Sequence, residues 1–80
     1  LGFCQNRGIA TEGSRRILRY AFEDLDQNVV DACARPENRA STRVMEKCGM
    51  KRLGPMKHPR FDGIVDRYIV TRDEAILDPR

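Results

Sequence analysis

The sequence predicts a mixed α/β fold with the element order helix, strand, helix, strand, strand. Apolar residues recur at helical spacing in residues 10–25 and 38–48, and they alternate with polar residues in 29–35. Gly, Pro and Asp residues separate these segments, as turns require. Helices that alternate with strands indicate an α/β arrangement, and 80 residues leave room for a single domain, residues 1–80.

The first predicted helix, residues 10–25, is amphipathic. Its apolar face consists of Ile17, Leu18, Ala21, Phe22 and Leu25. The polar run 26–28 ends this helix, and a strand follows in residues 29–35. The two faces of that strand carry Val30, Ala32 and Ala34, and Val29, Asp31, Cys33 and Arg35. Pro36 closes the strand because it cannot donate to a strand hydrogen-bond ladder.

The second predicted helix covers residues 38–48. Asn38 can cap it, because its side-chain oxygen can accept a hydrogen bond from a backbone N–H two or three residues further on. The apolar side of the helix consists of Ala40, Val44, Met45 and Cys48. Gly49 stands where a left-handed C-terminal cap is expected.

The last part of the chain predicts two strands and a turn. A short strand at 50–53 is broken by Gly54 and Pro55, and a polar loop then leads to a strand at 65–71. These two strands are expected to pair as a hairpin, and residues 72–77 are expected to form one helical turn.

The composition indicates a polar globular protein, with 40% hydrophobic residues, 34% charged residues and a net charge of +3. No apolar run approaches the roughly 18 residues that span a membrane, and no export leader is recognisable. We therefore expect a cytoplasmic location and no membrane partner. The chain begins with Leu1, so we also expect it to be part of a longer protein.

The three cysteines, Cys4, Cys33 and Cys48, are far apart and form no pair with metal-ligand spacing. Their odd number and the absence of an export signal predict reduced thiols and no metal site. Cys33 and Cys48 fall on apolar patterns and are expected in the core. Cys4 could be a nucleophile, but no neighbour in the sequence would activate it. His58 could be a base, although its polar loop favours a surface position.

Segment 5–12 joins a donor-rich loop to the start of the first helix. A helix leaves about four backbone N–H groups unpaired in its first turn, and its dipole adds roughly half a positive charge there. The small residues Gly8 and Ala10 would let a phosphate approach the backbone. Phosphate binding and an ordinary loop-to-helix turn both fit this segment when it is taken alone.

The pattern Gln-x-x-Gly-x-Ala in this segment resembles the acyl-CoA pyrophosphate loop of the GNAT-superfamily N-acetyltransferases. Residues 36–50 resemble the Asn-x-x-Ser helix of the branch that includes the ribosomal-protein N-terminal acetyltransferases. The residues that match are Pro36, Glu37, Asn38, Ser41, Glu46, Lys47 and Gly49. The tail 58–63, with Asp66 and Tyr68, is similar to the same branch.

The resemblance implies an acetyl-CoA site and gives roles to particular residues. The pyrophosphate would lie on Gln5, Asn6, Arg7, Gly8, Ile9, Ala10 and Thr11. Asn38 would bind the pantetheine amides, with helix capping as the alternative role. Ser41 would contact the cofactor sulfur or act as the candidate general acid, with a second local cap as the alternative. Met45 stands where many family members carry a tyrosine acid.

The implied reaction transfers an acetyl group from acetyl-CoA to a primary amine by direct attack, with no covalent enzyme intermediate. The family fold is longer than this chain, so the resemblance covers its C-terminal, CoA-binding half. Residues 1–4 are expected to be too short for the strand that precedes the loop in the family. The strand 29–35 would then expose an unpaired edge, which predicts a homodimer through strand pairing or exchanged elements.

Two other functions remain open. A non-catalytic module of the same ancestry would bind acyl-CoA, or only itself, without turnover. A small basic nucleic-acid binder could use Arg15, Arg16 and Arg19, but the chain lacks stacking aromatics on a strand and a recognition helix rich in Arg or Lys. We therefore expect no nucleic-acid partner, and the fold leaves the amine acceptor open.

Overall fold

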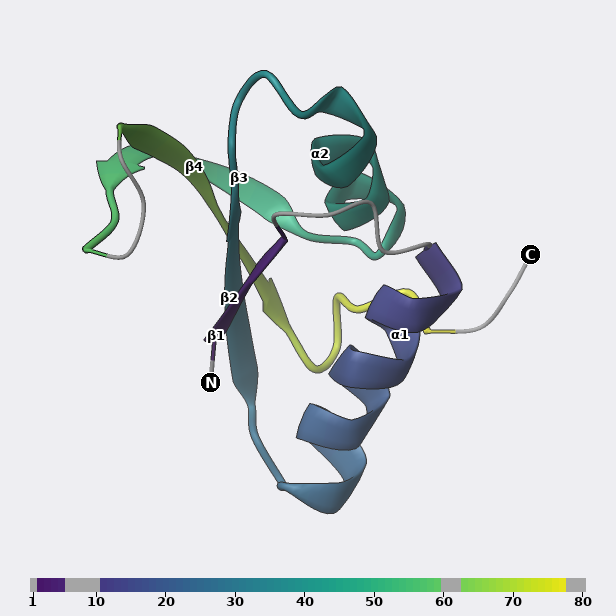
Figure 1. The fold of residues 1–80 in the computed structure, drawn as a ribbon. Coiled ribbons are helices and arrows are strands. Elements are labelled where there is room, and N and C mark those ends of the chain that lie inside the picture. The colour runs from purple at the N-terminus through teal and green to yellow at the C-terminus, as the bar shows by residue number, and fades with distance from the viewer. Residues whose placement is uncertain (1, 6–10, 60–62, 78–80) are drawn as a thin grey trace.

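Four strands form one sheet in the order β1-β2-β4-β3, and two helices pack on one of its faces (Figure 1). The computed structural model describes residues 2–5, 11–59 and 63–77. The elements are β1 (Gly2–Gln5), α1 (Thr11–Arg19), β2 (Val29–Ala34), α2 (Arg39–Lys47), β3 (Lys51–Lys57) and β4 (Ile64–Thr71). β1 and β2 are parallel, whereas β4 pairs antiparallel with both β2 and β3. The predicted mixed α/β fold is therefore confirmed.

The structure contains one strand more than the sequence predicted. Gly2–Gln5 forms β1 and pairs with β2 from Gly2 opposite Asp31 to Gln5 opposite Ala34. The expectation that these residues are too short for this strand is wrong, because β2 supplies a partner for each of them. β2 consequently has a neighbour on both sides, so its predicted unpaired edge is wrong as well. Within the described residues, the outer strands are β1 and β3.

The first helix changes its winding halfway along. α1 continues as a π-helical segment, Tyr20–Asp24, in which the N–H of Leu25 donates to the carbonyl of Tyr20 over 3.1 Å. The wider turn rotates the following residues around the helix axis relative to the apolar face. Leu25 is consequently exposed, although the sequence pattern had placed it on that face. The predicted first residue, Ala10, lies outside the described residues. No helix in the described part of the chain is long and apolar enough to cross a membrane.

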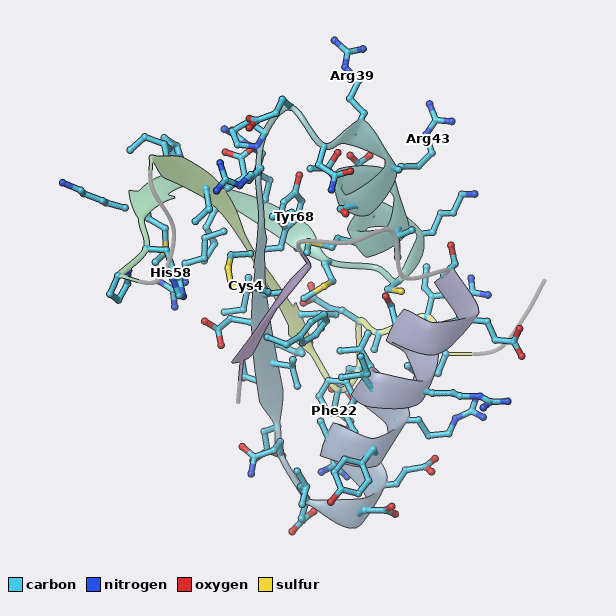
Figure 2. All side chains as sticks on the ribbon, viewed as in Figure 1. Cys4, Phe22, Arg39, Arg43, His58 and Tyr68 are labelled. Carbon is cyan, nitrogen blue, oxygen red and sulfur yellow. A yellow bond between two sulfur atoms is a disulfide. The ribbon has the colours of Figure 1, made fainter. Side chains whose placement is uncertain are left out.

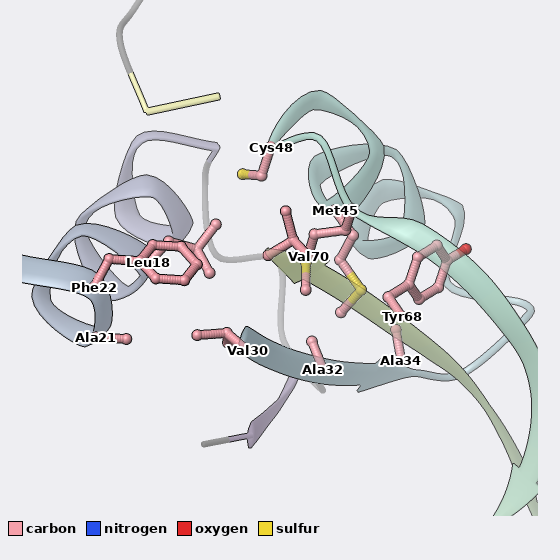
Figure 3. Close-up of a cluster of buried hydrophobic side chains, with 11 residues drawn as sticks. Leu18, Ala21, Phe22, Val30, Ala32, Ala34, Met45, Cys48, Tyr68 and Val70 are labelled. Carbon is pink, nitrogen blue, oxygen red and sulfur yellow. The ribbon is translucent and has the colours of Figure 1, made fainter. Parts of the chain in front are cut away.

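The core lies between the helices and one face of the sheet (Figure 3). It contains Leu18, Ala21, Phe22, Val30, Ala32, Ala34, Met45, Cys48, Met50, Tyr68 and Val70. The alternation predicted for β2 is confirmed, since its core-facing residues are those assigned to one face. On α2, Met45 and Cys48 are buried as predicted, whereas Ala40 is exposed. Burial raises the pKa of the Cys48 thiol.

α2 has both of its predicted caps. Asn38 precedes the helix and its side-chain oxygen accepts a hydrogen bond from the N–H of Ser41, at 3.2 Å. After the helix, Gly49 adopts a φ of +87°, which glycine tolerates better than any other residue. The chain therefore enters and leaves α2 as the sequence predicts.

β3 runs beyond the break predicted at Gly54 and Pro55. The strand continues to Lys57, and its register shifts between Arg52 and Gly54 as at a β-bulge. Gly54 permits this bulge with a φ of +128°, and Pro55 is tolerated because β3 lies at an edge of the sheet.

The segment after β4 closes the far end of the core. It starts with one hydrogen-bonded turn, and the N–H of Ile76 then donates to the carbonyl of Cys48 over 2.9 Å. Arg15 and Arg19 of α1 donate to the carbonyls of Ile76 and Leu77, at 3.2 and 2.8 Å. Arg15 and Arg19 thus hold the C-terminal segment against α1.

Candidate functional site

The predicted acetyl-CoA site lies where β1 and β2 end. These strands are parallel and Gln5 pairs with Ala34, so both strands end at the same edge of the sheet. α1 begins at Thr11, shortly after the end of β1, and α2 begins at Arg39, shortly after the end of β2. The ends of β1 and β2, which lead into the two sequence motifs, therefore lie at one edge of the sheet.

Five residues of the predicted pyrophosphate loop lie outside the described residues, namely Asn6, Arg7, Gly8, Ile9 and Ala10. The residues on either side are described. Gln5 is the last residue of β1, and Thr11 is the half-buried first residue of α1. This strand-to-helix passage is the setting in which the first N–H groups of a helix can face an anion.

Asn38 has the capping role that the sequence allowed. Its Oδ1 accepts the hydrogen bond from Ser41, and the side chain is half-buried. This bond uses the amide oxygen, so the Nδ2 group of the same side chain retains its chemical capacity to donate. Capping and ligand binding by Asn38 are therefore compatible.

Ser41 is completely buried in the first turn of α2, and Ser14 of α1 is buried as well. Because the Ser41 side chain is buried, its hydroxyl can contact a ligand only if that ligand enters between the helices and strands that cover Ser41. Met45, one turn further along α2, is buried among core residues and packs there. The structure thus gives Met45 a packing role.

The opposite face of the sheet holds a disulfide between Cys4 and Cys33. Pairing of β1 with β2 sets these two residues directly opposite each other, with their Cα atoms 4.5 Å apart. The prediction of three reduced thiols is therefore wrong for this structure, in which Cys48 alone is a free cysteine. Sequence spacing gave no signal for the bond, because it depends on a strand that was not predicted.

A cavity of about 800 Å³ adjoins this disulfide. Cys4, Cys33, His58 and Arg67 contribute to its lining, and Arg67 forms an ion pair with Asp31 over 3.4 Å. His58 is half-buried there rather than on the open surface as predicted. Figure 2 shows Cys4 and His58 on the side of the sheet away from Phe22 and the helices.

None of the described residues of the predicted acetyl-CoA site is among the residues that line this cavity. Neither Asn38 nor Ser41 lines the cavity.

The two tail residues that resemble the family, Asp66 and Tyr68, lie on the helix-covered face of β4. The buried carboxylate of Asp66 accepts a hydrogen bond from Arg52 at 2.8 Å. Burial raises the pKa of the Tyr68 hydroxyl, and the negative charges of Asp66 and Glu46 raise it further. Asp66 therefore has a structural partner on β3, and Tyr68 is influenced by a charge on α2.

Comparison with known proteins agrees with this arrangement. The acetyltransferase (GNAT) domain model matches residues 2–51. The "Uncharacterized N-acetyltransferase YnaD" of Bacillus subtilis is 43% identical over 53 residues, which are 66% of this chain and 31% of that protein. The "FsC-acetyl coenzyme A-N(2)-transacetylase" of Aspergillus fumigatus is 36% identical over 75 residues, which are 85% of this chain and 32% of that protein.

A solved structure is similar as well. The GNAT-family acetyltransferase of Bacillus anthracis superposes with a TM-score of 0.67 at 33% identity, covering 86% of this chain and 44% of that one. The chain spans about a third of the length of the two curated relatives that it matches here. The matched domain covers more than half of the sequence, and the sheet, the two helices and the parallel strand pair accompany it. The chain therefore belongs to the GNAT acetyltransferase family of acyltransferases.

Proposed function

We propose that this chain binds acetyl-CoA and forms the donor-binding part of an N-acetyltransferase that acetylates a primary amine. The parallel pairing of β1 with β2 carries the proposal, because it brings both motif-bearing connections to one edge of the sheet. A relative whose name includes acetyl coenzyme A supports the choice of donor. The pyrophosphate would lie on residues 5–11, and Asn38 would donate from its amide nitrogen to the pantetheine arm.

The chemistry requires no covalent enzyme intermediate. A neutral amine attacks the thioester carbonyl and negative charge develops on the carbonyl oxygen. The nitrogen then loses one proton to solvent, the carbon–sulfur bond breaks, and CoA leaves as a thiolate. Ser41 is the candidate proton donor to that thiolate. Replacing Ser41 with alanine should then lower kcat and leave the dissociation constant of acetyl-CoA unchanged, whereas a purely structural Ser41 would affect folding alone.

Calorimetric titration with acetyl-CoA tests the binding step. The wild-type protein should bind, and Gly8→Glu should weaken binding by at least about tenfold, because it places a carboxylate beside the pyrophosphate. Asn28→Glu is the matched control, since it adds the same charge at an exposed position just before β2, at the opposite end of that strand. Absence of wild-type binding would refute the proposed function but not the family membership.

A second candidate function is a non-catalytic module of the same ancestry that binds acyl-CoA or only itself. Measuring the release of CoA thiol with a panel of amines separates the two functions. Turnover supports the transferase, and binding without turnover on any amine supports the module.

We also propose a homodimer, now through the edge of β1 rather than of β2. The other outer strand among the described residues, β3, carries Pro55, a bulge, two lysines and one arginine, and such features oppose edge-to-edge pairing. β1 has the sequence Gly-Phe-Cys-Gln and lacks them. A well-folded monomer in sedimentation velocity would contradict this proposal.

A cytoplasmic location and the absence of nucleic-acid and membrane partners remain predictions. Arg15 and Arg19 donate hydrogen bonds to backbone carbonyls of the C-terminal segment, so they already have a structural role. This role supports the prediction that the protein has no nucleic-acid partner. A nucleic-acid affinity that falls steeply with salt would contradict it.

A further inference from the structure

We propose that Cys4, Cys33 and His58 form a zinc site when the Cys4–Cys33 disulfide is reduced. The two sulfur atoms and an imidazole nitrogen of His58 all lie within 4.8 Å of one another. Cys33 is buried, and Cys4 and His58 are half-buried beside the cavity. This inference goes beyond the proposed acetyl-CoA function and does not depend on it.

Three separate parts of the fold supply the ligands. Cys4 comes from β1, Cys33 lies directly opposite it on β2, and His58 follows the last residue of β3. The strand register holds the two cysteines together whether or not their sulfur atoms are bonded. A site assembled by sheet pairing needs no short Cys-x-x-Cys spacing, so the sequence alone did not indicate it.

The donor set and its spacing suit Zn²⁺. Two thiolates and one imidazole are a known zinc ligand set that leaves a fourth position open. Tetrahedral coordination with bonds of about 2.3 Å to sulfur and 2.0–2.1 Å to nitrogen puts the ligand atoms about 3.6–3.8 Å apart. The three ligand atoms, which lie within 4.8 Å of one another, can reach that spacing after the sulfur–sulfur bond is broken. The cavity provides an entry path and room for a water or another ligand in the fourth position.

The metal-bound and disulfide states exclude each other. Reduction by a low-molecular-weight thiol breaks the sulfur–sulfur bond, transfers two electrons to the protein sulfurs and leaves the reductant as its own disulfide. Zinc binding then displaces one proton from each thiol and gives two coordinated thiolates. A low-molecular-weight disulfide reverses the exchange, reforms the Cys4–Cys33 bond and releases the metal.

Zinc titration of the protein, reduced by a phosphine and freed of metal by a chelator that is then removed, tests this proposal. One Zn²⁺ should bind per chain, and the oxidised protein should bind none at this site. Substituting Co²⁺ should produce the absorption bands of a cobalt–thiolate complex. Cys4→Ser and Cys33→Ser should each weaken Zn²⁺ binding by more than about 100-fold, since even outer-shell changes cost 10–100-fold. His58→Gln should weaken it by at least about tenfold.

Cys48→Ala is the matched control, because Cys48 is a free cysteine buried in the core on the other face of the sheet. Its zinc affinity should equal that of the wild-type protein. Circular dichroism checks the folding of each variant. Alkylation is a second test, which uses the wild-type protein alone. Bound Zn²⁺ should protect Cys4 and Cys33 from alkylation until a chelator is added. Equal zinc affinity in the reduced wild-type protein and in a Cys4→Ser/Cys33→Ser variant would overturn the proposal, as would unprotected thiols.

Discussion

The side-chain oxygen of Asn38 accepts a hydrogen bond from the backbone N–H of Ser41, so the two residues of the Asn-x-x-Ser motif meet in the first turn of α2. The bond spans 3.2 Å and satisfies a helix N–H that has no partner within the helix. This arrangement explains why the motif occurs at the start of a helix. It also separates a structural task of Asn38, done by the amide oxygen, from a binding task left to the amide nitrogen.

Substitutions at Asn38 should separate these two tasks. Asn38→Ser and Asn38→Asp keep a capping oxygen and should change the free energy of unfolding by only a few tenths of a kcal/mol, whereas Asn38→Ala should lower it by about 1 kcal/mol. All three remove the amide donor and should weaken acetyl-CoA binding. Urea unfolding and calorimetry measure the two effects. Wild-type affinity in Asn38→Ser would show that Asn38 only caps the helix.

Breaking the Cys4–Cys33 disulfide should destabilise the protein. The bond joins residues 29 positions apart, and a crosslink that closes a loop of that length stabilises the folded state by about 3.6 kcal/mol, because it lowers the entropy of the unfolded chain. A reductant, with a chelator present to remove metals, should therefore lower the urea midpoint of the wild-type protein. Cys48→Ala should respond as the wild type does, and a Cys4→Ala/Cys33→Ala variant should not respond. A midpoint that reductant leaves unchanged would contradict the prediction.

Local patterns predicted most of the fold. Helical spacing identified both helices, alternation identified β2, and the caps of α2 at Asn38 and Gly49 followed from residue type alone. The errors came from features that depend on distant parts of the chain. β1 is too short to show a pattern of its own, and it exists because β2 lies beside it.

The candidate site shows the same division. The sequence indicated its residue types because the chemistry of a helix start is local, and the parallel strand pair shows that β1 and β2 end at one edge of the sheet. The sequence did not predict that Cys4, Cys33 and His58 lie together, because their grouping depends on β1 and on the path of the chain after β3. The π-helical turn that exposes Leu25 also has no signal in the hydrophobic pattern.

Gly49 should be far less replaceable than Gly63. Both glycines have positive φ angles, +87° and +96°, so alanine at either position costs about 1–2 kcal/mol in backbone strain. At Gly49 an added Cβ would also lie 2.5 Å from the backbone carbonyl oxygen of Glu74, whereas at Gly63 it would meet none of the described residues within 4 Å. Gly49→Ala should thus cost at least about 1 kcal/mol more than Gly63→Ala. Equal urea midpoints for the two variants would contradict this packing argument.

Glu74 should make part of the stability depend on acid pH. Its carboxylate lies 3.0 Å from the ammonium of Lys51 and accepts hydrogen bonds from the hydroxyl and the N–H of Thr71, at 3.0 and 3.4 Å. The Lys51 interaction, followed by the Thr71 hydrogen bonds, lowers the pKa of Glu74 in the folded protein.

Because the folded pKa lies below that of the unfolded chain, about 4.3, the stabilisation is fully present above that value. It is lost as the pH falls through the folded pKa, since the folded state must then take up a proton that the unfolded state already holds. Glu74→Gln should lose less stability than the wild type between pH 7 and acid pH, as measured by urea unfolding at each pH. Glu12→Gln is the control, because the ion pair of Glu12 with Arg16 is 3.8 Å long and exposed, and such pairs contribute little. Parallel stability curves for Glu74→Gln and the wild type would show that the Lys51 and Thr71 contacts do not stabilise the charged carboxylate in solution.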